Sequence, residues 1–352
     1  MRAEAAARAS LAIRTRHNGE AWMQLAGSLL AQHRFPEALA AARRATPYSD
    51  QAYRQCAGLE IEIGQYQAAE RDLAKSPPRG EDPAFLALAA RLLEVRGKNA
   101  DALALLQEAA SQADANLDMP HQSVAWFHER LGHRLSSMGR LDEAEQSYNA
   151  ALKVFPRDYR TMAALARLHA ARNDWQHAIE WGDKAAAIVP APETFALLGD
   201  AYAALGQASA AAGQWKLVEQ IGALARSQGA VYDRQRALFY ADHNRNLQEA
   251  VTLARGELRL RKDIYAHDTL AWTLFKAGKL AEAEAAATRA RAMGTQDATL
   301  FYHAGSIALA RGQRDRARLL LSRALEINPT FDPTAPRRVR AVLAQLGTKS
   351  TP

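Results

Sequence analysis

The clearest pattern of apolar and polar positions lies in the stretch from Phe301 to Pro329. Small residues at Ala304 and Ala308 are four positions apart, so they share one face of a helix. Gly312 ends this helix, and the apolar stripe of a second helix follows at Ala317, Leu321 and Ala324. The pattern predicts two short antiparallel helices. Such a hairpin cannot bury its apolar face alone and needs similar neighbours on both sides.

The same spacing returns along most of the chain, most clearly from His128 to Pro156. With the Gly between the paired helices, or its substitute, as a marker, nine units align at His33, Gly64, Gly97, Gly139, Asn173, Gly206, Arg245, Gly278 and Gly312. Most intervals are 31 to 34 residues, and two are longer, at 42 and 39. The sequence is therefore built from a repeated helical hairpin.

This pattern resembles that of the tetratricopeptide repeat family, whose unit is a 34-residue helix-turn-helix. The resemblance covers residues 19–330 and implies an all-α fold, a right-handed α-solenoid of about nine hairpins. We expect residues 1–18 to form a partial or capping helix and residues 331–352 a capping helix and tail. Insertions are expected near residues 111–119 and 221–230. The seventh unit is the least regular, because Arg245 stands where the turn Gly is expected.

The pattern begins halfway through a hairpin, since Ala5, Ala9 and Ala12 have the spacing of a second helix. Two explanations remain open: this helix is an N-terminal cap, or an upstream segment such as a signal has been removed. No uncharged apolar run approaches the ~18–20 residues that span a bilayer. We therefore expect a soluble protein without a transmembrane segment, in either the periplasm or the cytoplasm of a bacterium.

Charge and rare residues narrow the function. The net charge of +7 permits acidic partners, but the charges are dispersed rather than grouped in blocks. The single cysteine, Cys56, excludes an intramolecular disulfide, and its apolar neighbours favour a buried thiol over a reactive one. The ten histidines form no HExxH motif, and there is no P-loop, GxSxG or dinucleotide fingerprint. We therefore expect no enzyme activity, no cofactor and no metal site.

The resemblance implies that the first helix of each hairpin lines a concave groove. The residues expected there are basic in the early units and aromatic in the later ones: Arg54, Arg91, Trp126, Arg130, Arg167, Tyr232, Phe239, Tyr265, Trp272, Tyr302 and His303. Arginines bind carboxylates through two parallel hydrogen bonds, and aromatic rings give large, rigid contact areas. The pattern predicts a non-enzymatic scaffold that binds a protein or peptide with acidic residues and apolar anchors. Bacterial members of this family suggest a role in assembly or secretion of a complex.

Two alternatives stay open at this point. The arginines could form an ordinary solvated surface, and Phe239 and Trp272 could fill the core between hairpins. Alternatively, a nucleic acid could bind the basic C-terminal end, at Arg311, Arg314, Arg316, Arg318, Arg323, Arg337, Arg338 and Arg340. The chain has no helix-turn-helix reader or repeated base-reading pair, which favours a protein partner. The sequence leaves the oligomeric state open.

Overall fold

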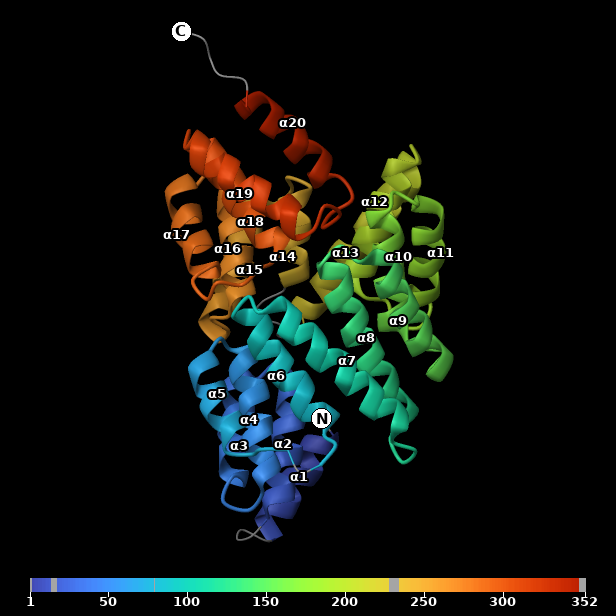
Figure 1. Ribbon diagram of the computed structural model, residues 1–352, viewed down its shortest axis with the longest axis vertical. Coiled ribbons are helices and arrows are strands. Elements are labelled where there is room, and N and C mark those ends of the chain that lie inside the picture. The colour runs from blue at the N-terminus through green and yellow to red at the C-terminus, as the bar shows by residue number, and fades with distance from the viewer. Residues whose placement is uncertain (1, 14–17, 79, 228–233, 348–352) are drawn as a thin grey trace.

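The computed structural model describes residues 2–13, 18–78, 80–227 and 234–347. In these ranges all regular secondary structure is helical, with twenty helices wound into one coil (Figure 1). The predicted all-α solenoid is confirmed. Among the described residues no helix is long and apolar enough to cross a membrane.

Nine helix pairs follow one another in the described part of the chain. They are α2 (Gly19–Ala31) with α3 (Phe35–Ala45), α4 (Asp50–Glu62) with α5 (Tyr66–Ala74), α6 (Pro83–Val95) with α7 (Asn99–Ala115), α8 (His121–Ser137) with α9 (Leu141–Val154), α10 (Tyr159–Ala171) with α11 (Trp175–Ala186), α12 (Pro192–Ala204) with α13 (Ala208–Ser227), α14 (Arg234–Asp242) with α15 (Leu247–Leu260), α16 (Ile264–Lys276) with α17 (Leu280–Ala290), and α18 (Ala298–Ala310) with α19 (Arg314–Ile327). Before them comes α1 (Arg2–Ile13), which packs on α2, and after them α20 (Ala335–Gly347), which packs on α19.

Small residues let the two helices of a hairpin approach closely. A Cβ atom added at Gly132 would collide with the ring of Tyr148, and one added at Gly305 would collide with Leu321. In both hairpins the large residue lies sixteen positions after the Gly. Large side chains of the second helix thus fill the space that the first helix leaves open, and Tyr148 is only 1% exposed.

The turns between paired helices need a residue with positive φ. His33 and Asn173 take this conformation with φ of 58° and 60°, in the place that Gly has in other units. In the seventh hairpin the prediction was wrong by one residue, because Asn244 has φ of 52° and Arg245 does not have a positive φ. Asn246 also has a positive φ, of 42°, so this turn has one residue more than the others. The Asn side chain tolerates this conformation better than Arg does.

The two long intervals are mostly extra helix. Helix α7 continues to Ala115, and α13 continues to Ser227, so each second helix is longer than the repeat requires. The lone Cys56 is fully buried, as expected, and burial raises the pKa of its thiol to about 11.

The coil closes on itself after six hairpins. Figure 1 shows α16 to α19 stacked against α4 to α7, and hydrogen bonds connect the two turns of the coil. The backbone N–H of Lys262 donates to the carbonyl of Ile63 at 3.1 Å, and Thr295 Oγ1 donates to the carbonyl of Val95 at 2.5 Å. An ion pair of 2.9 Å joins Arg261 to Glu62. These partners are 199 or 200 positions apart in the sequence.

Another contact between the turns of the coil holds the segment that follows α19. Asn328 Nδ2 donates to the carbonyl of Ser136 at 3.0 Å, and its Oδ1 accepts from the backbone N–H of Thr330 at 2.8 Å. Residues 330–334 are thereby directed toward the inside of the coil before α20 begins. The C-terminal segment therefore does more than cover the last hairpin, because it also lines an internal cavity.

A central cavity lined by aromatic and acidic residues

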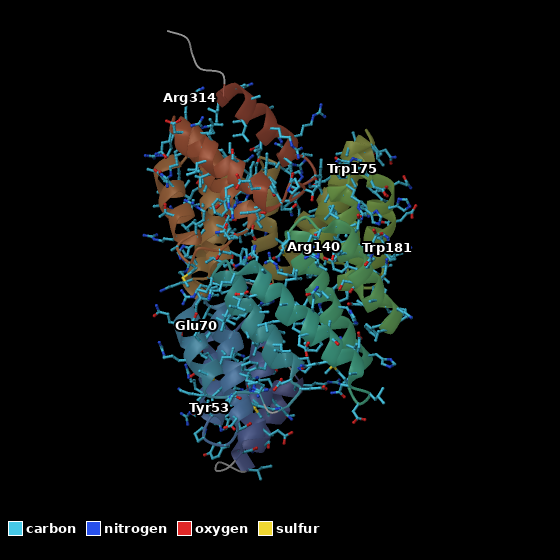
Figure 2. All side chains as sticks on the ribbon, viewed as in Figure 1. Tyr53, Glu70, Arg140, Trp175, Trp181 and Arg314 are labelled. Carbon is cyan, nitrogen blue, oxygen red and sulfur yellow. The ribbon has the colours of Figure 1, made fainter. Side chains whose placement is uncertain are left out.

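Two adjoining hollows of about 830 and 700 Å³ lie inside the coil and share much of their lining. We call them together the central cavity. Their walls come from α8 to α14, α16, α18 to α20 and the segment between α19 and α20. Figure 2 places Trp175, at the start of α11, nearer to α20 than Trp181, which lies at the outer edge of the molecule in this view. The cavity exists because successive first helices face each other across the turn of the coil.

The deepest aromatic group is built on α16 and α18. Trp272 is 5% exposed and its ring stacks on His303, with 4.0 Å between ring centres and 15° between planes. Trp272 Nε1 donates a 2.6 Å hydrogen bond to Asp242 Oδ1 at the end of α14. Tyr302 is half-buried and contacts Phe331 of the C-terminal segment, with 5.3 Å between ring centres. The rings therefore continue from the core into the wall of the cavity.

A second aromatic group lies one hairpin earlier. The ring of His243 contacts those of Trp215 and Phe239, with 4.9 and 4.5 Å between ring centres. Asp200 Oδ1 is 2.7 Å from His243 Nε2 and accepts from Trp215 Nε1 at 3.2 Å. As with Asp242 and Trp272, an aspartate at the inner face fixes the indole N–H. This arrangement orients the Trp rings while leaving part of Trp215 accessible from the cavity.

Burial and charge act in opposite directions on the two histidines. Burial lowers the pKa of His303, but the negative charge of Asp268 and a 2.9 Å hydrogen bond to it outweigh burial, so the pKa is raised. The pKa of His243 is also raised, because the contact with Asp200 outweighs burial. Burial raises the pKa of Asp242 despite the hydrogen bond from Trp272. Both imidazoles therefore hold a proton more readily than a free histidine.

Carboxylates outnumber permanent cations on the cavity wall. Among the described lining residues, the acids are Glu193, Asp200, Asp242, Asp297 and Asp332, and the bases with permanent charge are Arg167, Lys276 and Arg338. The overall chain has the opposite sign, with a net charge of +7. The wall is thus aromatic and carries two more carboxylates than permanent cations, and protonation of His243 and His303 would offset this excess.

Comparison with known proteins decides the family. Residues 130–193 and 269–333 match the family described as tetratricopeptide repeat. The chain therefore contains tetratricopeptide repeats. Proteins of this family are generally non-enzymatic interaction scaffolds, and the repeats support a scaffold function here.

Several solved structures resemble this chain at low identity. A tetratricopeptide repeat protein from Parabacteroides merdae is 19% identical, with 75% of this chain and 98% of that chain covered and a TM-score of 0.42. The type IV pilus biogenesis factor PilW is 18% identical over 56% of this chain and 90% of its own, with a TM-score of 0.47. PilF of Pseudomonas aeruginosa is 16% identical over 64% and 96%, with a TM-score of 0.47. No curated protein matches the chain significantly.

Three of the four arginines predicted to face a partner form ion pairs within the tetratricopeptide repeat coil. Arg54 pairs with Asp82, Arg91 with Glu62 at 2.5 Å, and Arg130 with Glu94 at 3.4 Å. Each pair joins neighbouring hairpins, so these arginines contribute to stacking. Arg167 is exposed, has no ion pair with the described residues and lines the central cavity.

The predicted aromatic row is divided by burial. Phe239, Trp272 and His303 are 3%, 5% and 6% exposed, so they present at most an edge to the cavity. Tyr302 is half-buried in the cavity wall. Tyr265 and Trp126 are 44% and 39% exposed but lie outside the cavity lining. Tyr232 lies outside the described residues.

Several residues of the cavity were missed because only first helices were considered. Trp175 begins a second helix, Trp215 lies within one, and Phe331 and Asp332 belong to the C-terminal segment. One signal was present in the sequence: Trp215 follows Gly199 by sixteen positions, as Tyr148 follows Gly132. The repeat therefore indicates that Trp215 packs on its own hairpin beside the inner face.

Part of the basic C-terminal end forms ion pairs within the molecule. Arg311 and Arg316 both pair with Glu284, and Arg323 pairs with Glu326 at 2.9 Å. Arg338 faces the central cavity rather than an outer basic surface. These contacts do not favour the nucleic-acid alternative.

Proposed function

We propose that this protein binds a segment of a partner protein inside the central cavity and organises a complex without catalysing a reaction. The observation that carries the proposal is the lining itself: partly accessible rings of Trp175, Trp215 and Tyr302 lie beside carboxylates. Such rings supply contact area at low cost in conformational entropy. The cavity has the size of a site for a few side chains rather than for a folded domain.

The charge of the lining favours a partner segment with basic and apolar residues. A Lys or Arg side chain can lie on an aromatic face while its charge contacts a carboxylate such as Asp200. The acidic partner predicted from the sequence depended on four arginines, of which Arg54, Arg91 and Arg130 are compensated by neighbouring carboxylates. The proposal therefore keeps the peptide partner and reverses its charge.

A peptide-display selection on the intact protein would test both the place and the charge. Ala203→Trp would fill part of the cavity, because Ala203 is exposed and lines it. Ala212→Trp is the matched control, since Ala212 is also exposed, on α13, but lies outside the lining. We expect basic, aromatic-rich peptides whose binding is lost in the first variant and kept in the second.

Each other outcome would contradict part of the proposal. Selection of mainly acidic peptides would contradict the charge argument and favour binding by the arginines that the sequence predicted. Equal binding by both variants would place the partner outside the cavity. Capture of nucleic acid that is released by salt would replace the proposal by the nucleic-acid alternative.

A further inference from the structure

A group of three potential metal ligands lies at the turn between α10 and α11, apart from the aromatic groups of the cavity. His169 is in the last turn of α10, Asp174 is the N-cap of α11, and His177 is in the first turn of α11. Asn173, with φ of 60°, reverses the chain and brings the end of one helix beside the start of the next. Residues eight positions apart in sequence are thereby placed together.

Their distances suit a common ion. The Nδ1 atoms of His169 and His177 lie 3.1 and 2.8 Å from Asp174 Oδ2, and the two rings stack with 5.2 Å between centres. One ligand atom from each residue lies within 4.8 Å of the other two. Two ligands bound to one ion at about 2.0–2.2 Å are about 3 Å apart when the angle between them is near 90°. Binding therefore needs only small side-chain shifts.

The surroundings support the same conclusion. His169 is 9% exposed, whereas the side chain of His177 is 56% exposed, so the group has a buried side and an entry side. On the far side of His169, Glu145 Oε1 lies 3.8 Å from Nε2 and is itself paired with Arg172. Metal-binding histidines commonly have a carboxylate at the second ring nitrogen.

We propose that His169, Asp174 and His177 bind a divalent transition-metal ion, with water completing the coordination. Two imidazoles and one carboxylate suit zinc, nickel or copper better than magnesium or calcium, which prefer oxygen ligands. The bound ion joins the end of α10 to the start of α11. Because Trp175 follows Asp174 directly, the ion also fixes a ring that lines the central cavity.

The same contacts have a simpler explanation, in which Asp174 only caps α11. Its side chain accepts from the backbone N–H of His177 at 3.4 Å and hydrogen-bonds both rings. The two explanations differ in what Asn would do at this position. Asn is as good an N-cap as Asp, but it is a much weaker metal ligand because it carries no charge.

Calorimetric titration of the intact, untagged protein with zinc, nickel and magnesium chlorides, after removal of metal by a chelator, would test the site. We expect one zinc or nickel ion per chain and no magnesium. His177→Ala and Asp174→Asn should each weaken binding at least ~10-fold. Both variants should keep the wild-type urea midpoint in the absence of metal, because His177 is exposed and Asn retains the cap.

His128→Ala is the matched control, since His128 contacts a single carboxylate, Asp114, at 2.8 Å. Its zinc affinity should equal that of the wild type. Undiminished zinc binding by Asp174→Asn, equal losses in all three variants, or no zinc binding by the wild type would overturn the proposal.

Discussion

At the scale of single residues, the most unusual group is a pair of buried carboxyls beneath α3. Glu60 is fully buried and Asp72 is 2% exposed, and Arg43 forms ion pairs with both. Burial, with the added negative charge of Asp72, raises the pKa of Glu60 from 4.5 to about 7, although Arg43 opposes the rise. Glu60 Oε2 has no hydrogen-bond partner among the described residues. This carboxyl is therefore suited to remaining protonated in the folded protein.

This pKa makes stability depend on pH in a defined direction. Between about pH 4.5 and 7 the folded protein holds a proton on Glu60 that the unfolded chain has lost, so the free energy of unfolding falls as pH rises. A shift of this size corresponds to about 3 kcal/mol across that interval. Glu60→Gln should remove this part of the slope, because its amide can accept from Arg43 and donate to Asp72 without titrating. Urea unfolding of the wild type and the variant at pH 5 and 7.5 measures this change in slope. The same change in the free energy of unfolding with pH for both proteins would contradict the raised pKa.

A second prediction concerns the thiol of Cys56. Because the side chain is fully buried and its pKa is raised to about 11, the thiolate that reacts with disulfide reagents is scarce and inaccessible. We expect the native protein to react with such a reagent far more slowly than the urea-unfolded protein. Equal rates in the two states would show that this part of the coil opens readily.

At the scale of helices, much of the fold follows from the sequence because each hairpin repeats its own local rules. Eight of the nine marker residues chosen from the sequence have a positive φ and lie in the turns between paired helices. The seventh turn was misplaced by one residue, since the spacing alone cannot show which of several polar residues takes a positive φ. The central cavity was not predictable, because it depends on how helices from different hairpins meet and on the course of residues 330–335.

The candidate sites illustrate the same limit. The sequence located the aromatic residues Trp272, Tyr302 and His303 on first helices, and the structure brings them together. It did not show that the arginines are paired, because their partners, such as Glu62 for Arg91, lie in a neighbouring hairpin. It also missed His169 and His177, because pairs of histidines were sought on one helix rather than across a turn.

Trp272 of α16 is more deeply buried than Tyr302 of α18, so their replacement should reduce stability by different amounts. Trp272→Ala would remove a buried ring and leave Asp242 without its 2.6 Å donor, so we expect a loss of about 3–5 kcal/mol in the free energy of unfolding. Tyr302→Ala removes a half-buried ring and should cost about 1–2 kcal/mol. Chemical denaturation measures both losses. A larger loss for Tyr302 than for Trp272 would contradict these assignments.

At the scale of the whole molecule, the contacts between turns of the coil set this protein apart from a simple stack. In an open solenoid each repeat contacts only its neighbours, so stability is a sum over adjacent pairs. Here hairpin α4–α5 also contacts the entry to α16–α17, through Ile63 and Lys262, six hairpins further along. We therefore expect the two halves of the coil to unfold together rather than one hairpin at a time.

Two glycines of matched conformation test this coupling. Gly97 and Gly278 have φ of 73° and 77°, so replacing either by Ala costs about 1 kcal/mol from the backbone alone. A Cβ at Gly97 would also collide with the carbonyl of Gly294 in the next turn, whereas nothing lies within 4 Å of a Cβ at Gly278. Gly97→Ala should therefore cost at least about 1–2 kcal/mol more than Gly278→Ala and broaden the urea transition. Equal losses would mean that the two turns of the coil move apart freely.

The distance along the chain between these partners also bears on how the protein is made. Ile63 and Lys262 are 199 positions apart, so at ~5–20 residues per second the ribosome needs about 10–40 s to supply the second after the first. During this interval the early hairpins have formed, but the backbone carbonyls at Ile63 and Val95 still lack their partners. The same segment of another copy of the chain can form these hydrogen bonds instead. Synthesis of many copies close together therefore favours domain swapping between neighbouring molecules. The early half of the chain reaches its final state only after the late half has left the ribosome.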